Sequence, residues 1–366
     1  TKIFDISRVN GKISTSDLLE KYGFIKKISS GLYVQMHLMK KIVNNIENVI
    51  KSELDSIGCM EISLNQIQSS DMWKITGRYD TYGTEMFKLS DRSDNEMVIT
   101  GTNEELATIV AKDYVKSYRD LTLSFYQTNN KFRDEIRCNG GLIRCKEFSM
   151  MDAYSFHRND NDLNEYYSQM RNSYINILTK LGLEFTIEKA DSGEIGGSIS
   201  EEFVIKTSEG NIEIGHIFQL GDKYSSLLDA TFVDSDGETK NMQMGCYGIG
   251  ITRLAQVLAD VNRIGNNFNF NGVSSSFKYG IVVSNINDED QLRIGSQIYD
   301  YLISKGASVY LDDRDVRIGQ KLNDSDCIGT SYKILIGNNI KTRHFEIKTL
   351  SDSKWESKQL SEIYHL

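Results

Sequence analysis

The fold of this chain is decided by the segment 132–157, which reads FRDEIRCNGGLIRCKEFSMMDAYSFH. Residues 132–136 are typical of a strand, and the sequence CNGG at 138–141 predicts a turn. A second strand is predicted to pass through Phe148 as far as Met151. The segment therefore predicts two neighbouring strands joined by a glycine-rich connection.

Arg133 and Glu135 lie two positions apart in this segment. On a strand both would project from one face, because side chains alternate between the faces of a sheet. An arginine beside a glutamate can hold a phosphate and an exocyclic amine together, and Phe148 could stack on a purine. The alternative is a cross-strand ion pair beside a phenylalanine of the core.

Outward from this segment, the pattern predicts a sheet edged by helices. Apolar residues at helical spacing predict a helix over 36–57, and further helices are expected over 103–117 and 161–182. Residues 121–125 alternate as a strand, and short alternating segments follow between 187 and 244. This mixture of antiparallel strands and helices predicts an α+β fold.

The pattern changes towards the C-terminus. Residues 262–276 carry few apolar side chains and predict a domain boundary. Beyond it, strands are expected over 279–283, 308–311 and 333–336, with helices over 288–304 and 319–328. Strands that alternate with helices are typical of a small α/β domain with largely parallel strands. The sequence thus predicts two domains, residues 1–265 and residues 276–366.

Two further clusters carry side chains suited to ligand binding. Residues 245–254 read GCYGIGITRL, so the backbone can approach a ligand closely and Arg253 can stack or contact a phosphate. Residues 100–105 read TGTNEE, a turn that ends in a helix start. Tight packing explains the first cluster equally well, and an N-cap with acidic first-turn residues explains the second.

Composition limits the class of protein. Of the 366 residues, 39% are hydrophobic and 25% charged, which fits a globular protein and excludes a disordered or fibrous one. No apolar run approaches the roughly 20 residues of a membrane span, and residues 1–5 lack signal-peptide character. A cytoplasmic protein is therefore expected, with an organelle left open.

The net charge of −9 argues against bulk capture of nucleic acid but leaves a local basic surface open. The five cysteines contain no Cys-x-x-Cys and favour reduced thiols over a zinc site. The chain has no proline at all. At typical usage this absence has a probability on the order of one in 10⁸, so selection or design has excluded proline, and the sequence does not distinguish the two.

In this order, the three clusters resemble the motifs of class II aminoacyl-tRNA synthetases, and most closely those of bacterial-type prolyl-tRNA synthetases. Residues 132–157 match motif 2 of that family, and residues 244–254 match motif 3. Further matches are Trp73-x-x-x-Gly77-Arg78, Thr102-x-Glu104, Gly196-Gly197-Ser198-x-Ser200, Gly215-His216-Ile217-Phe218-x-Leu220-Gly221 and Leu311-Asp312-Asp313-Arg314-x-x-Arg317-x-Gly319-x-Lys321. The resemblance covers nearly the whole chain.

The resemblance implies a catalytic domain with an antiparallel sheet over 1–265 and an α/β anticodon-binding domain over 276–366. Such an enzyme activates L-proline with ATP and Mg²⁺ and transfers the prolyl group to the 3′ end of tRNA(Pro). It would be a homodimer with its interface built by motif 1. The family also implies that no metal is held by a cage of protein ligands.

The resemblance implies that the ATP-binding residues include three that are also expected to be catalytic, Arg133, Glu135 and Arg253. Arg133 would hold the α-phosphate, Glu135 would accept from the adenine amine, and Arg144 would meet the γ-phosphate. Phe148 and Arg253 would sandwich the adenine.

The remaining expected site residues bind the amino acid and the tRNA. Thr102 and Glu104 would bind the amine of proline, and Arg133 its carboxylate or carbonyl. The ring pocket would be lined by Tyr154, His216 and Cys246. The anticodon would be contacted by Asp313, Arg314, Arg317 and Lys321, with Lys333 on the same basic face.

The sequence departs from the family in three ways. By alignment, family prolines are replaced at Asn65, Ser69, Gly101, Thr122, Cys138, Asn241, Ser276, Ser284 and Ser331. At Gly101 this should loosen the amine-binding loop, since each such change favours the unfolded chain by roughly 0.4–1 kcal/mol. Glu201 stands where bacterial relatives often carry histidine, without a physical explanation from sequence.

The third departure is that the segment between motifs 2 and 3 has no room for the editing insertion of many bacterial relatives. Alanine is smaller than proline by about two methylenes, so size selection is weak. We expect alanine misactivation and a separate editing protein.

Two alternatives remain from sequence. One is a synthetase whose pocket has drifted to another amino acid. The other is a synthetase-like regulator that does not aminoacylate, although Arg133, Glu135, Phe148 and Arg253 are all retained together.

Overall fold

The computed structural model describes residues 11, 13–193, 195–270, 272–349, 351–352 and 354–365. These residues form two compact units. The sheet unit comprises residues 27–33 and 46–257, and the C-terminal unit comprises the described residues up to 26, residues 34–45 and those from 258 onward. The expectation for residues 1–5 lies outside the described residues, and the domain bounds 1–265 and 276–366 stay a prediction.

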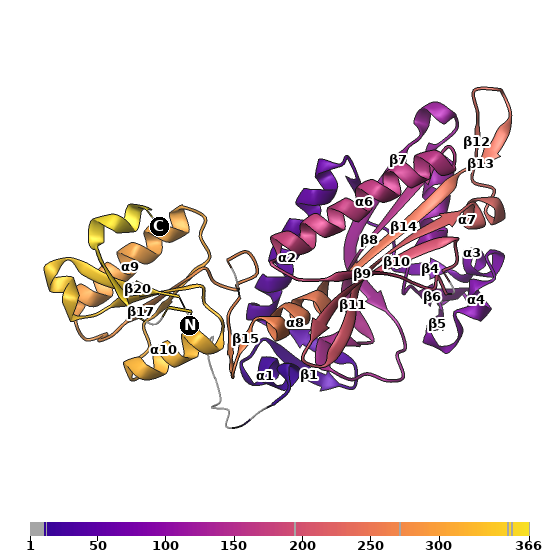
Figure 1. Cartoon of the computed structure of the whole chain (residues 1–366). Coiled ribbons are helices and arrows are strands. Elements are labelled where there is room, and N and C mark those ends of the chain that lie inside the picture. Colours follow the sequence, from indigo (N-terminus) through magenta and orange to yellow (C-terminus); the bar gives the residue numbers. More distant parts are fainter. Residues whose placement is uncertain are drawn as a thin grey trace. The chain divides into compact units, whose positions relative to one another are not determined.

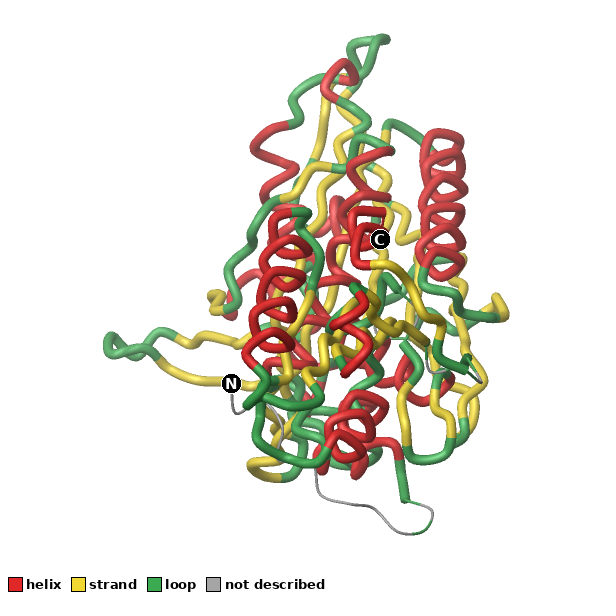
Figure 2. The backbone as a smooth tube through the Cα atoms, turned by 90° about the vertical axis from the view of Figure 1, so that its left-hand side faces the viewer, coloured by secondary structure: helices red, strands yellow, loops and turns green. Residues whose placement is uncertain are grey.

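The sheet unit is built on a seven-stranded sheet in the order β3-β7-β8-β14-β11-β10-β9 (Figure 1). Neighbouring strands run antiparallel except β3 and β7, which are parallel. The strands are β3 (Met60–Glu61), β7 (Leu123–Phe132), β8 (Glu147–His157), β9 (Thr186–Lys189), β10 (Ile199–Thr207), β11 (Gly210–Gly221) and β14 (Gln243–Gly250). Helices and strands are both abundant (Figure 2), which confirms the α+β prediction.

The fold-deciding segment forms the β7–β8 pair, with Leu123 opposite Phe156 and Phe132 opposite Glu147. The prediction that Arg133 and Glu135 lie on a strand is wrong, because β7 ends at Phe132. The Arg133 N–H still donates to the Lys146 carbonyl at 2.9 Å, but the Asp134 N–H turns away to the Glu85 carbonyl. The two predicted site residues therefore lie on a loop that leaves the end of the sheet.

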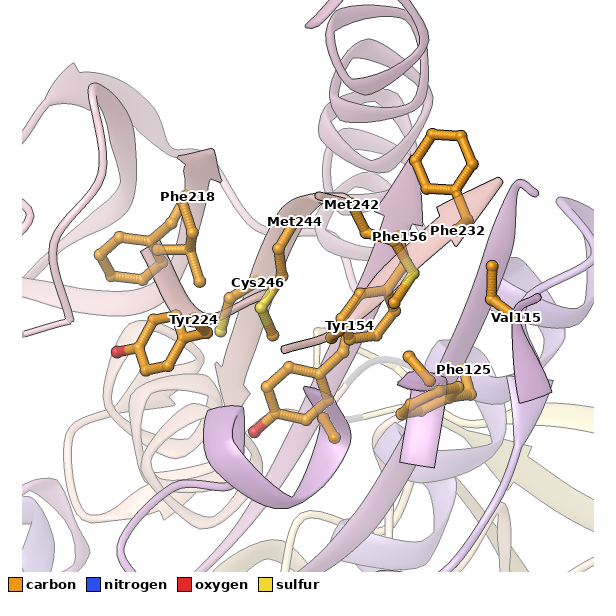
Figure 3. Close-up of a cluster of buried hydrophobic side chains, with 14 of the residues drawn as sticks. Val115, Phe125, Tyr154, Phe156, Phe218, Tyr224, Phe232, Met242, Met244 and Cys246 are labelled. Carbon is orange, nitrogen blue, oxygen red and sulfur yellow. The ribbon is translucent and has the colours of Figure 1, made fainter. Parts of the chain in front are cut away.

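Strand β8 sends side chains to both faces of the sheet, as alternation requires. Tyr154 and Phe156 belong to the buried cluster of Figure 3, together with Phe125 and Met244 of neighbouring strands. His157 lies on the other face, where its ring is 5.3 Å from that of Tyr166 in α6 (Asp160–Lys180). The centre of the sheet is thus buried on both faces.

The long predicted helices are confirmed. Helix α6 corresponds to the prediction over 161–182, and the Asn159 side chain caps it by accepting the Asp162 N–H at 3.0 Å. The helix predicted over 36–57 is α2 (His37–Ser56), and the one over 103–117 is α5 (Glu104–Tyr114).

Shorter elements complete the sheet unit. They include a three-stranded sheet and a hairpin that projects at the top of Figure 1. Their bounds are β4 (Ile67–Ser69), β5 (Phe87–Ser90), β6 (Glu96–Ile99), β12 (Thr231–Val233), β13 (Thr239–Asn241), α3 (Ser70–Ile75), α4 (Arg78–Thr81) and α7 (Lys223–Leu227). The C-terminal unit also contains α1 (Thr15–Lys21), β15 (Arg263–Ile264) and β16 (Asn267–Phe268). Residues of both units contribute to β1 (Ile25–Ser29), β2 (Leu32–Gln35) and α8 (Ile251–Val261).

The C-terminal unit contains a five-stranded sheet in the order β18-β17-β19-β20-β21. As predicted, the first three strands are parallel, and helices connect them. The bounds are β17 (Tyr279–Val283), α9 (Glu289–Ser304), β18 (Val309–Asp312), α10 (Ile318–Cys327) and β19 (Tyr332–Ile336). The antiparallel strands β20 (His344–Lys348) and β21 (Glu356–Gln359) were not predicted.

No helix of the described residues is both long and apolar enough to cross a membrane. All five cysteines are free thiols in the structure.

Candidate active site

The sheet unit encloses a cavity of about 620 Å³. Its walls come from the central strands β8, β11 and β14 and from the loops that follow β6 and β7. The cavity brings together nearly all the residues predicted to bind ATP and the amino acid: Thr102, Glu104, Arg133, Glu135, Arg144, Phe148, His216, Cys246 and Arg253. Residues more than 100 positions apart in sequence thus meet in one site.

One side of the cavity is lined by arginines. The Arg133 guanidinium lies 5.4 Å from the centre of the Phe148 ring. Arg144 and Glu135 approach each other to 3.7 Å. Burial lowers the pKa of Arg253, and the nearby charges of Arg133 and Arg144 lower it further. These cations repel one another, so a polyanion bound among them would be stabilised.

Backbone carbonyls hold the side chains of Arg133 and Arg253 in place. Arg253 donates from Nε to the Ile143 carbonyl at 2.9 Å and from Nη1 to the Glu213 carbonyl at 2.8 Å. Arg133 donates from Nη2 to the Gly101 carbonyl at 3.3 Å. The planar groups are therefore oriented before any ligand binds, which lowers the entropic cost of binding.

The segment that follows β6 brings a fully buried carboxylate, Glu104, to the same cavity. It accepts hydrogen bonds from the Thr102 hydroxyl (2.7 Å), from Arg78 Nη1 (2.9 Å) and from the Cys246 thiol (3.2 Å). Although burial raises the pKa of Glu104, Arg78 and Thr102 lower it more, so the pKa lies below its usual value. Burial and Glu104 raise the pKa of Cys246, so its thiol stays protonated and donates. The carboxylate is charged and rigidly held.

Arg78 and Glu105 complete this charged group, and sequence reasoning assigned neither a function. Arg78 Nη1 also lies 3.1 Å from Glu105 Oε2, and all three side chains are buried. Arginine is rarely fully buried, so there was no reason from sequence to place Arg78 inside the protein. Its one indication of a role was the match Trp73-x-x-x-Gly77-Arg78. Burial and the neighbouring charge of Glu104 raise the pKa of Glu105 more than Arg78 lowers it, so Glu104 is the more readily ionised of the two carboxylates and the one suited to a cationic ligand.

Tyr154 differs from its predicted place. It does not line the cavity, because its hydroxyl is buried between the Asn103 N–H and the Asp152 carboxylate. His216 does line the cavity, and its ring stacks on that of Phe218 with centroids 3.8 Å apart. The expectation of a ring-pocket residue thus fits His216 and not Tyr154.

One group of side chains in the described residues could hold a metal ion: Glu202, Glu213 and His216, with one ligand atom from each within 4.8 Å of the others. Glu213 and His216 also line the cavity. Two carboxylates and one imidazole fall short of the six oxygen ligands that Mg²⁺ prefers.

The four residues predicted to contact the anticodon lie around the end of β18: Asp313, Arg314, Arg317 and Lys321. Asp313 and Arg317 are exposed. Lys321 is buried and donates from Nζ to the Val283 carbonyl at 2.7 Å, so its expected direct contact needs correction. Its Nζ also donates to the Asp312 carbonyl at 3.4 Å, so the lysine bridges the ends of β17 and β18. Lys333 is likewise buried and paired with Asp326.

Arg314 is partly exposed and forms ion pairs with Asp312 (2.7 Å) and Asp324 (2.9 Å). A second cavity, of about 500 Å³, lies beside it and is also lined by Lys41 and Asp313.

Two family models match the chain. The model described as tRNA synthetase class II core domain (G, H, P, S and T) matches residues 87–262. The model described as anticodon binding domain matches residues 278–365.

Curated relatives extend this match to most of the chain. A proline–tRNA ligase of Sulfurimonas denitrificans is 34% identical over 398 aligned residues, which cover 93% of this chain and 92% of that protein. The chain belongs to the proline–tRNA ligase family. Another family member, from Rickettsia bellii, is 33% identical over 89% of this chain and 87% of its own length. Membership of the family confirms the resemblance inferred from the motifs.

Solved structures of prolyl-tRNA synthetases share the fold of this family member. One, from Cryptosporidium parvum in complex with L-proline and AMP, superposes with a TM-score of 0.85 at 18% identity and covers 95% of this chain and 72% of that chain. Another, from Giardia lamblia in complex with prolyl-adenylate, gives 0.85 at 19% identity and covers 95% and 74%. The predicted class II architecture is therefore confirmed.

The structure also accounts for Glu201, where the family often carries histidine. Its carboxylate accepts from Arg171 Nε at 3.2 Å and from the Tyr167 hydroxyl at 3.0 Å. The glutamate thus ties β10 to α6 by an ion pair that a neutral histidine would not form.

Proposed function

We propose that this chain is a proline–tRNA ligase, which activates L-proline with ATP and transfers the prolyl group to the 3′ end of tRNA(Pro). One observation carries the proposal beyond family membership. A single cavity joins the buried carboxylate of Glu104 to the arginines 133, 144 and 253. The amine of an amino acid and the phosphates of ATP can therefore bind side by side.

In the first step, a carboxylate oxygen of proline attacks the α-phosphorus of ATP. The bond to the β-phosphate oxygen breaks, and pyrophosphate leaves with the electron pair. Arg133 holds the α-phosphate and the proline carboxylate, and Arg144 meets the γ-phosphate. Phe148 and Arg253 sandwich the adenine, whose amine donates to Glu135. Positioning and charge stabilisation are sufficient, so no protein nucleophile is needed.

Glu104 and Thr102 bind the amine of proline, while Cys246 and His216 border its ring. In the second step, the terminal hydroxyl of the tRNA attacks the carbonyl carbon of prolyl-adenylate. The new ester bond forms as AMP leaves, and the hydroxyl proton is released. The site orients the adenylate for both steps, which accounts for the shared cavity.

Further parts of the proposal concern partners. Mg²⁺ would enter with ATP and take phosphate and water oxygens as most of its ligands. The carboxylates of Glu135 and Glu213 border the same cavity beside the arginines. The anticodon is contacted by Asp313, Arg314 and Arg317. The enzyme acts as a cytoplasmic homodimer, and a separate editing protein hydrolyses mischarged tRNA.

ATP–pyrophosphate exchange with each of the twenty amino acids tests this function. We expect exchange with proline, weaker exchange with alanine, and loss of at least roughly a hundredfold in Glu104→Gln, which keeps the shape but removes the charge. Thermal unfolding checks that the variant is folded. Exchange with a different amino acid alone would indicate drifted specificity, and none at all would favour the regulator.

A further inference from the structure

Strands β7 and β8 carry a buried ion pair beneath the amine-binding loop. Lys131 Nζ lies 2.7 Å from Asp152 Oδ1, and their side chains are 0% and 3% exposed. No expected site residue belongs to this pair. Burying two charges costs free energy, which the pair recovers only if further hydrogen bonds surround it. The pair is therefore a candidate for a role beyond stability.

The pair leads to the amine-binding loop through one hydroxyl. Asp152 Oδ2 accepts from the Tyr154 hydroxyl at 2.7 Å and from Gln127 Nε2 at 2.9 Å. The Tyr154 hydroxyl in turn accepts from the Asn103 N–H at 2.9 Å. Asn103 directly precedes Glu104, at the N-terminal end of α5. Figure 3 shows the Tyr154 hydroxyl directed away from Phe156 and Phe232, out of the apolar cluster.

We infer that Lys131, Asp152 and Tyr154 are positioning residues that fix the Glu104 loop in the conformation that receives the amine. Asp152 orients the tyrosine hydroxyl because a carboxylate can only accept. The hydroxyl then has its lone pairs free for the Asn103 N–H. Lys131 offsets the charge of Asp152 inside the sheet through their ion pair. The inference rests on the proposed function, because it assigns these residues to amino-acid binding.

Electrostatics favours this direction of the hydrogen bonds. Burial raises the pKa of Tyr154, and the charge of Asp152 raises it further, so the hydroxyl remains a donor to the carboxylate. Asp152 also borders the cavity. Its Oδ2 accepts two hydrogen bonds, whereas its Oδ1 has only the ion pair with Lys131, without a hydrogen bond.

The sheet offers a matched control on the next strand. The buried Tyr126 of β7 donates a hydrogen bond from its hydroxyl to Asp55 Oδ1 at 2.8 Å. This hydrogen bond does not involve the loop that carries Glu104. Tyr154→Phe and Tyr126→Phe therefore each remove one hydrogen bond from a buried tyrosine to an aspartate, which is buried for Tyr154 and exposed for Tyr126. Only the first also removes a contact to the loop that carries Glu104.

The test measures KM in ATP–pyrophosphate exchange with the full chain. For Tyr154→Phe we expect KM for proline to rise roughly tenfold, the size of one lost hydrogen bond to a well-placed group, with KM for ATP within about twofold. Tyr126→Phe should leave both values within about twofold. Asp152→Asn should raise KM for proline as Tyr154→Phe does, although it also leaves the buried Lys131 uncompensated and lowers stability. The KM of the double variant should be no higher than that of the poorer single variant.

Lys131→Met leaves Asp152 uncompensated, and that variant is expected to fold poorly. Lys131→Met combined with Asp152→Asn removes both charges, so it should recover thermal stability while KM for proline stays raised. A KM for proline that is unchanged in Tyr154→Phe, or effects that multiply in the double variant, would overturn the inference. Failure of the unmodified chain to activate proline would instead overturn the proposed function.

Discussion

At the scale of single residues, the motifs identified the groups that meet in the cavity, but not the groups that hold them. Thr102-x-Glu104 was recognisable because the resemblance supplies its function. The contact of Arg78 with both glutamates, and that of Tyr154 with Asn103, depend on three-dimensional packing. Tyr154 was consequently predicted to line the pocket, although its hydroxyl is bonded to Asn103 and Asp152 and does not face the cavity.

His157 makes stability depend on pH. Burial lowers the pKa of its imidazole to about 3, against an ordinary value of 6.5. The ring is neutral when folded and takes up a proton on unfolding between these two values, so the free energy of unfolding falls as the pH drops below about 6.5. For this one residue, the loss at pH 4.5 relative to pH 7 is about 2–3 kcal/mol.

His157→Gln removes this titration and can keep a hydrogen bond to the Ser155 hydroxyl, which now lies 2.7 Å from Nε2. Urea unfolding at pH 7 and pH 4.5 should give a smaller loss for the variant than for the unmodified chain. Equal losses in the two proteins would show that the pKa of His157 is the same in the folded and unfolded states.

At the scale of elements, amphipathic helices were predicted well and polar strands poorly. Helices α2 and α6 carry apolar residues at helical spacing, which needs no tertiary information. Strand β21 reads ESKQ and has no apolar side chain, so only its pairing with β20 makes it a strand. The amine-binding loop was expected to be loose, yet a Cβ on Gly101 would lie 2.5 Å from the Tyr82 hydroxyl. The Gly101 backbone therefore packs closely against Tyr82, and the looseness of the loop stays a prediction.

Restoring a family proline should not stabilise β17. The Ser284 N–H donates to the Ile336 carbonyl at 2.9 Å and extends the β17–β19 pairing by one hydrogen bond. Proline has no N–H, so Ser284→Pro should lower the free energy of unfolding by about 1–3 kcal/mol.

Ser284→Ala is the matched control, because it removes only the side-chain hydrogen bond to Gln291. Urea unfolding of both variants measures the difference that belongs to the backbone. A proline variant as stable as the alanine variant would contradict the assigned hydrogen bond.

At the scale of the whole molecule, the described residues between β8 and β14 form α6, β9 to β13 and α7, with no further domain among them. Strands β10 and β11 are joined by two residues, Ser208 and Glu209. This agrees with the prediction that the editing insertion is absent. Selection against alanine then depends on the pocket, where each missing methylene is worth only roughly 1–3 kcal/mol.

We therefore expect the purified chain to form Ala-tRNA(Pro) slowly and to leave it intact. Incubation of preformed Ala-tRNA(Pro) with the enzyme, beside an enzyme-free control, measures its hydrolysis. Deacylation faster than in the control would reveal an editing activity within this chain.

The two glutamates that share Arg78 have a consequence for the folded protein itself. An ammonium group that binds beside Glu104 pairs with a carboxylate buried inside the sheet unit, and only the folded chain offers that site. The amino acid is then a stabiliser as well as a substrate, adding about 1.4 kcal/mol for each tenfold rise in concentration above its Kd. A cell rich in this amino acid would protect the enzyme from unfolding, and starvation would leave it more exposed to proteases.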